Sequence, residues 1–220
     1  MRAPRAIAFD LDGTLVDSRL DIAAACNHVL IAAGREPLQP DVLGAYVGDG
    51  VRALVARAFG LPEKGPPDAR LDAWAAELVD YYAAHPAALT RWMPGALPAL
   101  DALARLPLAL VTNKARAVTV RVLAALGGAS RFAFVYAGGD GPLKPDPAPI
   151  AAVARALAVD VADLWVVGDG DQDILAARAA GAVSVAVRGG FADDARLRAA
   201  RPDATLGSLA ELPPLVRSAG

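Results

Sequence analysis

Cysteine and histidine are scarce in this chain of 220 residues. Its single cysteine, Cys26, has no second cysteine with which to form an intramolecular disulfide. The two histidines, His28 and His85, leave too few ligands for a zinc site built from cysteine and histidine. Any metal ion bound by this chain would therefore be held by oxygen atoms.

The sequence also lacks long apolar runs and a large excess of one charge. Although 55% of the residues are hydrophobic, no stretch of about 18 apolar residues is free of charge, so no membrane-spanning helix is expected. With 22 basic and 24 acidic residues, the chain has no strong positive charge of the kind that nucleic-acid-binding proteins carry. The apolar run before Asp10 is too short for a signal peptide. We therefore expect a cytoplasmic monomer or homodimer that binds neither nucleic acid nor membrane.

Short apolar runs alternate with alanine-rich helical patterns along much of the chain. This alternation predicts an α/β fold, with a Rossmann-like parallel sheet flanked by helices. The runs are almost continuously apolar, as is typical of strands covered on both faces. Strands are expected at residues 6–9, 108–111, 132–136, 164–167 and 183–187. Helices are expected at residues 115–126, 148–157 and 173–180, with left-handed caps at Gly127 and Gly181.

One long interval, residues 17–90, has helical patterns but no convincing strand. Ser18 with Asp21 three residues later predicts a capping box at the start of a helix that stops at Gly34. Further helices are expected at residues 50–59 and 69–84, with a proline-rich linker at residues 61–67 between them. This interval is far longer than a βα loop needs. The sequence therefore predicts a helical cap domain of residues 17–90, inserted into a core domain of residues 1–16 and 91–220.

Polar residues follow four of the expected strands, at the edge where open parallel sheets bind ligands. They are Asp10 and Asp12 after the first strand, Thr112 and Asn113 after the second, Lys144 after the third, and Asp169, Asp171 and Asp173 after the fourth. Residues two apart in an extended segment face the same side, so Asp10 and Asp12 are expected to face one site. An ionised carboxylate can attack phosphorus, and a neighbouring carboxyl group with a raised pKa suits acid–base chemistry.

The acidic residues after the fourth strand indicate a metal site. Asp169 and Asp173, with Asp10 nearby, would concentrate negative charge, and ligation by oxygen alone suits Mg²⁺. For Asp171 we favour a role at the positive end of the following helix over metal binding. Thr112 and Lys144 would supply a hydroxyl and an ammonium for phosphoryl oxygens. Taken singly, each residue also has an ordinary structural interpretation, as a turn, a strand position or a surface charge.

Together, these motifs resemble those of the haloacid dehalogenase superfamily of aspartate-dependent phosphatases. The residues that carry the resemblance are Asp10-Leu11-Asp12-Gly13-Thr14-Leu15, Thr112-Asn113, Lys144-Pro145 and Gly168-Asp169 through Asp173. The resemblance implies that Asp10 forms an aspartyl-phosphate and that Asp12 acts as general acid and base. It implies phosphate binding by Thr112, Asn113 and Lys144. It also implies that Mg²⁺ is bound by Asp10, the Asp12 carbonyl and Asp169, with Asp173 in support.

Within the superfamily, Asp12 favours phosphatase or phosphomutase chemistry, because a halide leaving group needs no proton. Residues 14–18, 46–50, 111–114 and 144–149 look most like those of phosphoglycolate phosphatases. The expected reaction is thus Mg²⁺-dependent hydrolysis of 2-phosphoglycolate to glycolate and phosphate. Alternatives are a phosphatase acting on another metabolite such as N-acetylmuramic acid 6-phosphate, and a β-phosphoglucomutase-like enzyme. A receiver-type phosphoryl-accepting module, from a different class, needs neither the cap nor Asp12.

Three basic residues of the expected cap are candidates for binding a substrate carboxylate: Arg19, His28 and Arg52. Such an anion requires a fixed cation beside it. Arg52 is preferred because it lies just after Gly48-Asp49-Gly50. Each of the three also fits an exposed helical face with ordinary charges.

Overall fold

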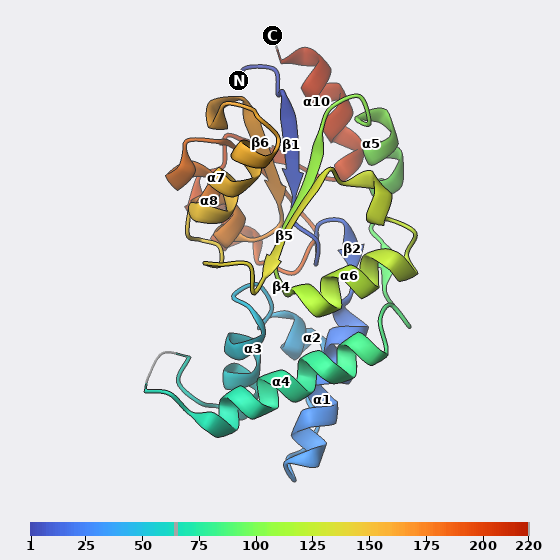
Figure 1. The fold of residues 1–220 in the computed structure, drawn as a ribbon, viewed down its shortest axis with the longest axis vertical. Coiled ribbons are helices and arrows are strands. Elements are labelled where there is room, and N and C mark those ends of the chain that lie inside the picture. Colours follow the sequence, from blue (N-terminus) through green and yellow to red (C-terminus); the bar gives the residue numbers. More distant parts are fainter. Residues whose placement is uncertain (64–65, 220) are drawn as a thin grey trace.

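The computed structural model describes residues 1–63 and 66–219 and confirms the expected α/β fold (Figure 1). Its main sheet has six strands, all parallel to their neighbours. Their spatial order is β5 (Phe134–Gly138), β4 (Leu108–Ala115), β1 (Ala6–Phe9), β6 (Leu164–Gly168), β7 (Val183–Val187) and β8 (Ala204–Leu206). The central position of β1 and β6 brings the residues that follow them to the middle of one edge.

Helices cover both faces of this sheet, and alternate residues of β1 pack on opposite sides. Ile7 and Phe9 belong to a hydrophobic cluster with α5 (Ala96–Ala102) and α10 (Leu212–Ser218). Ala6 and Ala8 join the cluster formed with α7 (Ala148–Ala156) and α8 (Asp171–Ala180). The core also contains α6 (Arg116–Ala125), α9 (Asp194–Ala200) and the 3₁₀ turns η1 (Ala129–Arg131), η2 (Val161–Asp163) and η3 (Leu209–Glu211). No helix in the described part of the chain has the length and apolar character of a membrane span.

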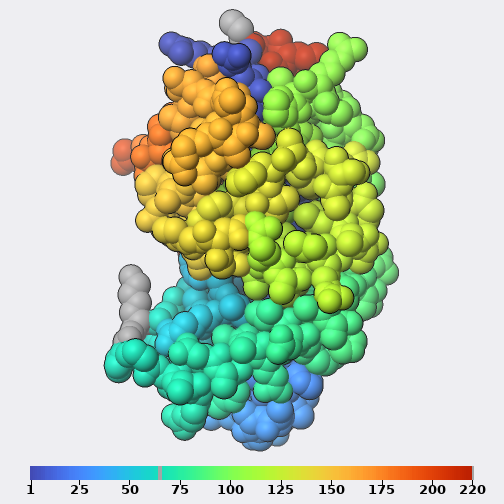
Figure 2. Space-filling view, viewed as in Figure 1, coloured from blue at the N-terminus to red at the C-terminus, as the bar shows by residue number. Residues whose placement is uncertain are grey.

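The interval after β1 forms four helices, which are called the cap below. They are α1 (Arg19–Ala32), α2 (Pro40–Gly44), α3 (Val51–Phe59) and α4 (Ala69–Ala84). Figure 1 shows them at the end of the sheet toward which β4 and β5 point, and Figure 2 shows cap and core in contact on this face. Leu30, Val55 and Leu78 share one hydrophobic cluster, which also takes in Val118 and Val122 of α6. The cap therefore packs against the core through α6, while the expected boundary at residues 17–90 stays a prediction.

The two chain segments that join cap and core form a short antiparallel pair, β2 (Val16–Asp17) and β3 (Arg91–Trp92). The capping box expected here is wrong. The Ser18 hydroxyl donates to Asp12 Oδ1 at 2.5 Å and makes no helix cap. Asp21 instead accepts hydrogen bonds from the Leu89 and Thr90 amides and from the Thr90 hydroxyl. Asp21 therefore ties the outgoing segment to the returning one.

Differences from the sequence expectations lie at element ends and in short elements that were not expected, among them α2, α5, α9 and α10. β5 begins at Phe134, two residues later than expected, and β4 continues to Ala115, with an irregular register between Val111 and Ala115. β8 was not expected, because a strand of three residues is too short to give an apolar pattern. Gly127 and Gly181 have positive φ angles of 64° and 82°, as predicted after α6 and α8. Residues 64 and 65 of the linker expected at 61–67 lie outside the described residues.

Candidate active site

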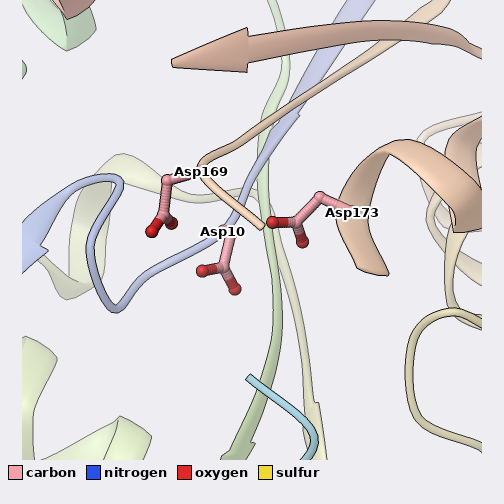
Figure 3. Close-up of side chains that lie close together, drawn as sticks. All are labelled: Asp10, Asp169 and Asp173. Atoms are coloured by element: carbon pink, nitrogen blue, oxygen red, sulfur yellow. The ribbon is translucent and has the colours of Figure 1, made fainter. Parts of the chain in front are cut away.

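Three buried carboxylates meet at the centre of the sheet edge: Asp10, Asp169 and Asp173. Asp10 directly follows β1, Asp169 directly follows β6, and Asp173 lies in the first turn of α8. Each offers one oxygen to a group whose members all lie within 4.8 Å of one another. Figure 3 shows the Asp173 carboxylate pointing from α8 toward Asp10. The structure thus brings together the acidic residues that were expected to converge.

Lys144 lies within this cluster, with a side chain that is only 2% exposed. Its Nζ donates to Asp10 Oδ1 at 2.7 Å, to Asp173 Oδ1 at 2.5 Å and to the Val111 carbonyl at 2.7 Å. An ammonium group has three N–H donors. The three acceptors therefore match its donors, and they fix both the side chain and the Asp10 oxygen that it contacts.

Among the described residues, this cluster holds more carboxyl groups than ammonium groups. Burial raises the pKa of Asp10 to about 7, with Lys144 opposing the shift, and burial together with the charge of Asp10 raises the pKa of Asp169 to about 6. Burial also raises the pKa of Asp173. The Lys144 ammonium contacts Asp10 and Asp173, whereas the hydrogen-bond donors to Asp169 are uncharged, and a buried unpaired charge is costly. The oxygen donors and the excess negative charge fit a bound Mg²⁺ ion.

The orientation of Asp169 is fixed by two hydrogen bonds. The Thr14 hydroxyl donates to Oδ1 at 2.7 Å and the Phe191 amide donates to Oδ2 at 2.7 Å. Gly13 has a φ angle of 86°, and a Cβ at this position would collide with the Asp169 carboxylate. Sequence reasoning missed both donors. Thr14 could have been found, because it lies within the first motif, whereas the amide of Phe191 leaves no signal in the sequence.

Asp12 lies beside this cluster and is held by a second lysine that sequence reasoning missed. Lys114 Nζ donates to both Asp12 oxygens, at 2.9 and 3.0 Å, and to the Tyr82 hydroxyl of α4 at 3.1 Å. The Lys114 side chain is 6% exposed. Burial acts to lower the pKa of Lys114, but the charge of Asp12 raises it and the net shift is upward. Lys114 therefore keeps its positive charge at the junction of core and cap.

Thr112 and Asn113 lie within β4 and are buried. The Asn113 side chain donates to the Gly48 carbonyl at 2.7 Å and to the Lys144 carbonyl at 2.8 Å, and its Oδ1 accepts from the Lys144 amide at 2.9 Å. This one amide group therefore connects the sheet edge, the Lys144 loop and a cap loop. The Thr112 hydroxyl accepts from the Lys114 amide at 3.2 Å.

A cavity of about 310 Å³ lies between the acidic cluster and the cap. Its polar wall comes from the core and contains Asp10, Asp12, Thr112, Asn113, Lys114 and Asp169. Its cap wall is largely apolar and contains Ile22, Val47, Val51, Leu54, Leu78 and Val79. The cavity therefore combines reactive groups from one domain with a water-excluding cover from the other.

The structure does not bring the three expected cap cations, Arg19, His28 and Arg52, into the lining of this cavity. Arg52 Nε instead lies 2.8 Å from Asp72 Oδ1, on α4. Acidic partners within the cap are Asp41 for Arg19, Glu77 for His28 and Asp72 for Arg52. Arg52 therefore lies outside the lining of this cavity, where an ion pair with a neighbouring helix holds its guanidinium, and its contact with a substrate stays a prediction.

Asp171 lines the cavity but does not belong to the carboxylate group described above. It lies in the first turn of α8, as favoured, and its Oδ1 is 2.8 Å from a guanidinium nitrogen of Arg196. The backbone cap of this helix comes from Asp173, whose Oδ2 accepts from the Gly170 amide at 3.0 Å. Asp173 thus serves the helix and the acidic cluster together.

Proteins with similar sequences and structures identify the family to which this chain belongs. Residues 7–187 match the sequence profile of the haloacid dehalogenase-like hydrolases. The phosphoglycolate phosphatase of Neisseria meningitidis is 40% identical over 217 residues, which cover 94% of this chain and 92% of that protein. That of Chromobacterium violaceum is 37% identical, with 97% of each chain covered. The crystal structure of a predicted phosphoglycolate phosphatase from Haemophilus somnus aligns with a TM-score of 0.86 and 26% identity, covering 98% of this chain and 99% of the other. This chain is a hydrolase and belongs to the haloacid dehalogenase-like hydrolase family.

Proposed function

We propose that this protein is a Mg²⁺-dependent phosphatase that hydrolyses 2-phosphoglycolate to glycolate and phosphate. The observation that carries this proposal is the buried group of Asp10, Asp169 and Asp173, two members of which, Asp10 and Asp169, line the cavity beneath the cap. Two relatives named phosphoglycolate phosphatase, which match this chain over more than nine-tenths of its length, support the choice of substrate.

The proposed reaction begins with Asp10. Lys144 holds Oδ1 of this carboxylate, and Oδ2 is the proposed nucleophilic atom. It forms a bond to phosphorus while the bond between phosphorus and the ester oxygen breaks, which gives an aspartyl-phosphate and glycolate. Asp12 donates a proton to the leaving oxygen. It then accepts a proton from the water that attacks phosphorus, which releases phosphate and restores Asp10.

The proposed metal ligands are Asp10, the Asp12 carbonyl and Asp169, with Asp173 in support. When bound, Mg²⁺ supplies positive charge that offsets the repulsion between a carboxylate and a phosphate group. Thr14 and the Phe191 amide keep Asp169 oriented for this role. The ligands are therefore arranged before the ion binds.

The proposed phosphate contacts are the Thr112 hydroxyl, the Asn113 backbone and Lys144. All three donors of Lys144 already have acceptors, so a phosphoryl oxygen could reach its ammonium only by replacing one of them. We therefore propose that Lys144 also orients Asp10 and offsets part of its charge. The Asn113 side chain is occupied by the Gly48 and Lys144 backbones, which supports a backbone contact for this residue.

The cavity also bears on the alternatives. Its volume of about 310 Å³ lies at the lower end of the range for ligand pockets, and it favours a compact substrate over a phosphorylated amino sugar. The apolar cover from the cap favours hydrolysis over a receiver-type role, because an exposed phosphoryl acceptor needs no lid. A cytoplasmic location, a monomeric or dimeric state and the absence of nucleic-acid partners stay predictions.

The direct test is an assay of the purified protein with Mg²⁺ against a panel of phosphate monoesters, ranked by kcat/KM. The panel should include 2-phosphoglycolate, N-acetylmuramic acid 6-phosphate and β-glucose 1-phosphate. We expect 2-phosphoglycolate to rank first, with one phosphate released per glycolate. A higher rank for another metabolite would contradict the proposed substrate. Conversion of β-glucose 1-phosphate without phosphate release would contradict the proposed hydrolysis.

A further inference from the structure

We propose that Lys114 binds the carboxylate of the substrate and so sets a preference for phosphate monoesters with an acid group next to the ester linkage. This inference rests on the phosphatase function proposed above and names the residue responsible for its substrate class. It moves the recognition of the substrate anion from the cap, where sequence reasoning placed it, to the end of β4 in the core.

The first observation concerns the cations around the cavity. Among the residues that the structure describes, Lys114 and Arg196 are the basic side chains that line it. Arg196 is 52% exposed and is paired with Asp171. Lys114 is 6% exposed, and a charge that is shielded from water interacts more strongly with an anion. Lys114 is therefore the better placed of the two to bind a second anionic group.

The second observation is the distance between Lys114 and Asp12. In the proposed reaction, Asp12 donates its proton to the ester oxygen of the substrate. The carboxylate carbon of 2-phosphoglycolate is only two bonds away from that oxygen, so this carboxylate has to lie close to Asp12. Lys114 Nζ is 2.9 Å from Asp12 Oδ1. A compact substrate can thus reach Lys114 and take the place of one of its three acceptors, which are the two Asp12 oxygens and the Tyr82 hydroxyl. Arg52, by contrast, is held by Asp72 outside the cavity lining.

The third observation is that the cap holds Lys114 in place. The hydroxyl of Tyr82 accepts a hydrogen bond from Lys114 Nζ, and the centre of its ring lies 4.3 Å from the same atom. Tyr82 comes from α4 and is buried. An ammonium fixed before binding loses less conformational entropy when the anion arrives. The lysine also offsets the repulsion that Asp12 would otherwise exert on a substrate carboxylate.

The test compares two substrates of similar size in the Lys114→Met variant. Ethyl phosphate has the same ester linkage as 2-phosphoglycolate but carries a methyl group in place of the carboxylate. Loss of a charge-assisted contact should lower kcat/KM for 2-phosphoglycolate roughly 10- to 100-fold more than for ethyl phosphate. Any misplacement of Asp12 would affect both substrates, and therefore cancels in the ratio of the two values.

Two further variants separate charge from structure. Lys114→Arg keeps the charge and should retain most of the preference for 2-phosphoglycolate. Arg196→Met removes the other cation in the lining. The ratio of kcat/KM for 2-phosphoglycolate to that for ethyl phosphate should change by less than about twofold in this variant. If circular dichroism shows that Lys114→Met is unfolded, Lys114→Gln takes its place, because it keeps a polar side chain while removing the charge.

Equal losses for the two substrates in Lys114→Met would overturn the inference and would make Lys114 a positioning residue for Asp12. A wild-type enzyme that hydrolyses ethyl phosphate as well as 2-phosphoglycolate would also overturn it, while leaving the phosphatase function intact. A wild-type enzyme that hydrolyses no phosphate monoester would overturn the proposed function itself. The two failures are therefore distinguishable.

Discussion

The core and the cap contribute opposite kinds of surface to the same cavity. The charged groups that the core brings to the site come from the ends of separate strands and contact one another there, as Asp10 does with Lys144. Charged groups of the cap pair among themselves away from the cavity, as Arg52 does with Asp72, and leave Leu54 to face inward. The difference teaches that the core supplies the charged groups of the site, whereas the cap supplies most of the apolar wall of the cavity.

The strongest test of this division is the removal of the proposed nucleophile. Asp10→Asn should lower kcat for 2-phosphoglycolate on the order of 10⁴-fold or more, because the amide cannot form the acyl-phosphate. Asp171→Asn is the matched control at the same sheet edge and should lower kcat less than about tenfold, because Asp171 pairs with Arg196. Retention of wild-type kcat in Asp10→Asn would refute the assignment of chemistry to this residue.

Removal of the metal ion should have the second largest effect on hydrolysis. Chelation with EDTA should abolish hydrolysis and added Mg²⁺ should restore it, because the three buried carboxylates otherwise repel the phosphate group. At a hundredfold excess over its Kd, Mg²⁺ should raise Tm by roughly 5–10 °C. Asp169→Asn should lose this increase, whereas Asp72→Asn in the cap should keep it. An increase of equal size in Asp169→Asn would place the ion elsewhere.

The metal-free protein should become less stable as pH rises. The folded-state pKa of Asp10 is about 7 and that of Asp169 about 6, against an ordinary value of 3.8. The folded protein therefore binds more protons than the unfolded chain. The resulting contribution to the free energy of unfolding is complete below pH 4 and is lost as pH rises through 6 and 7. In EDTA, Tm should fall by roughly 10 °C between pH 5 and pH 8. The fall should be smaller in Asp10→Asn, and an equal fall there would contradict the explanation.

The connection between cap and core offers a test of stability. Asp21→Ala should lower the free energy of unfolding by about 2–3 kcal/mol, because it leaves the Leu89 and Thr90 amides and the Thr90 hydroxyl without their acceptor. Urea denaturation would measure the change. Asp17→Ala is the control on the same segment, where the exposed side chain accepts from the Arg19 amide, and should cost less than about 1 kcal/mol. Equal losses in both variants would contradict this role of Asp21.

The smallest effect is expected in the outward-facing part of the cap. Arg52→Ala should change kcat/KM for 2-phosphoglycolate and for ethyl phosphate by less than about twofold, because an exposed ion pair contributes little. A selective loss with 2-phosphoglycolate would show that the cap cation reaches the substrate after all. It would also weaken the contrast between the two domains.

The sheet and the acidic cluster could be predicted because they depend on apolar runs and strand ends, which can be recognised without knowing how the side chains pack. Runs such as residues 6–9 and 164–167 are continuously apolar, which marks strands buried on both faces. Parallel strands end at a common edge, so Asp10 and Asp169 had to come close once both strands were identified. Their burial and their distances from Lys144 then follow from the fold.

Side-chain direction could not be predicted, because it depends on contacts between distant segments. Ser18 and Asp21 have the spacing of a capping box, but Asp12 and Thr90 are better partners for them in the folded chain. A helical pattern likewise does not say which neighbour will face Arg52. Lys114 looks like an ordinary exposed lysine until β4 and the cap enclose it.

The Asn113 amide connects a loop of the cap to the sheet edge that carries the site. Its hydrogen bond to the Gly48 carbonyl spans from β4 to the cap loop, while its other bonds hold the Lys144 backbone. A movement that lifts this loop would have to break that bond. Any displacement of the cap loop is thus coupled, through one side chain, to the loop that carries the lysine beside Asp10.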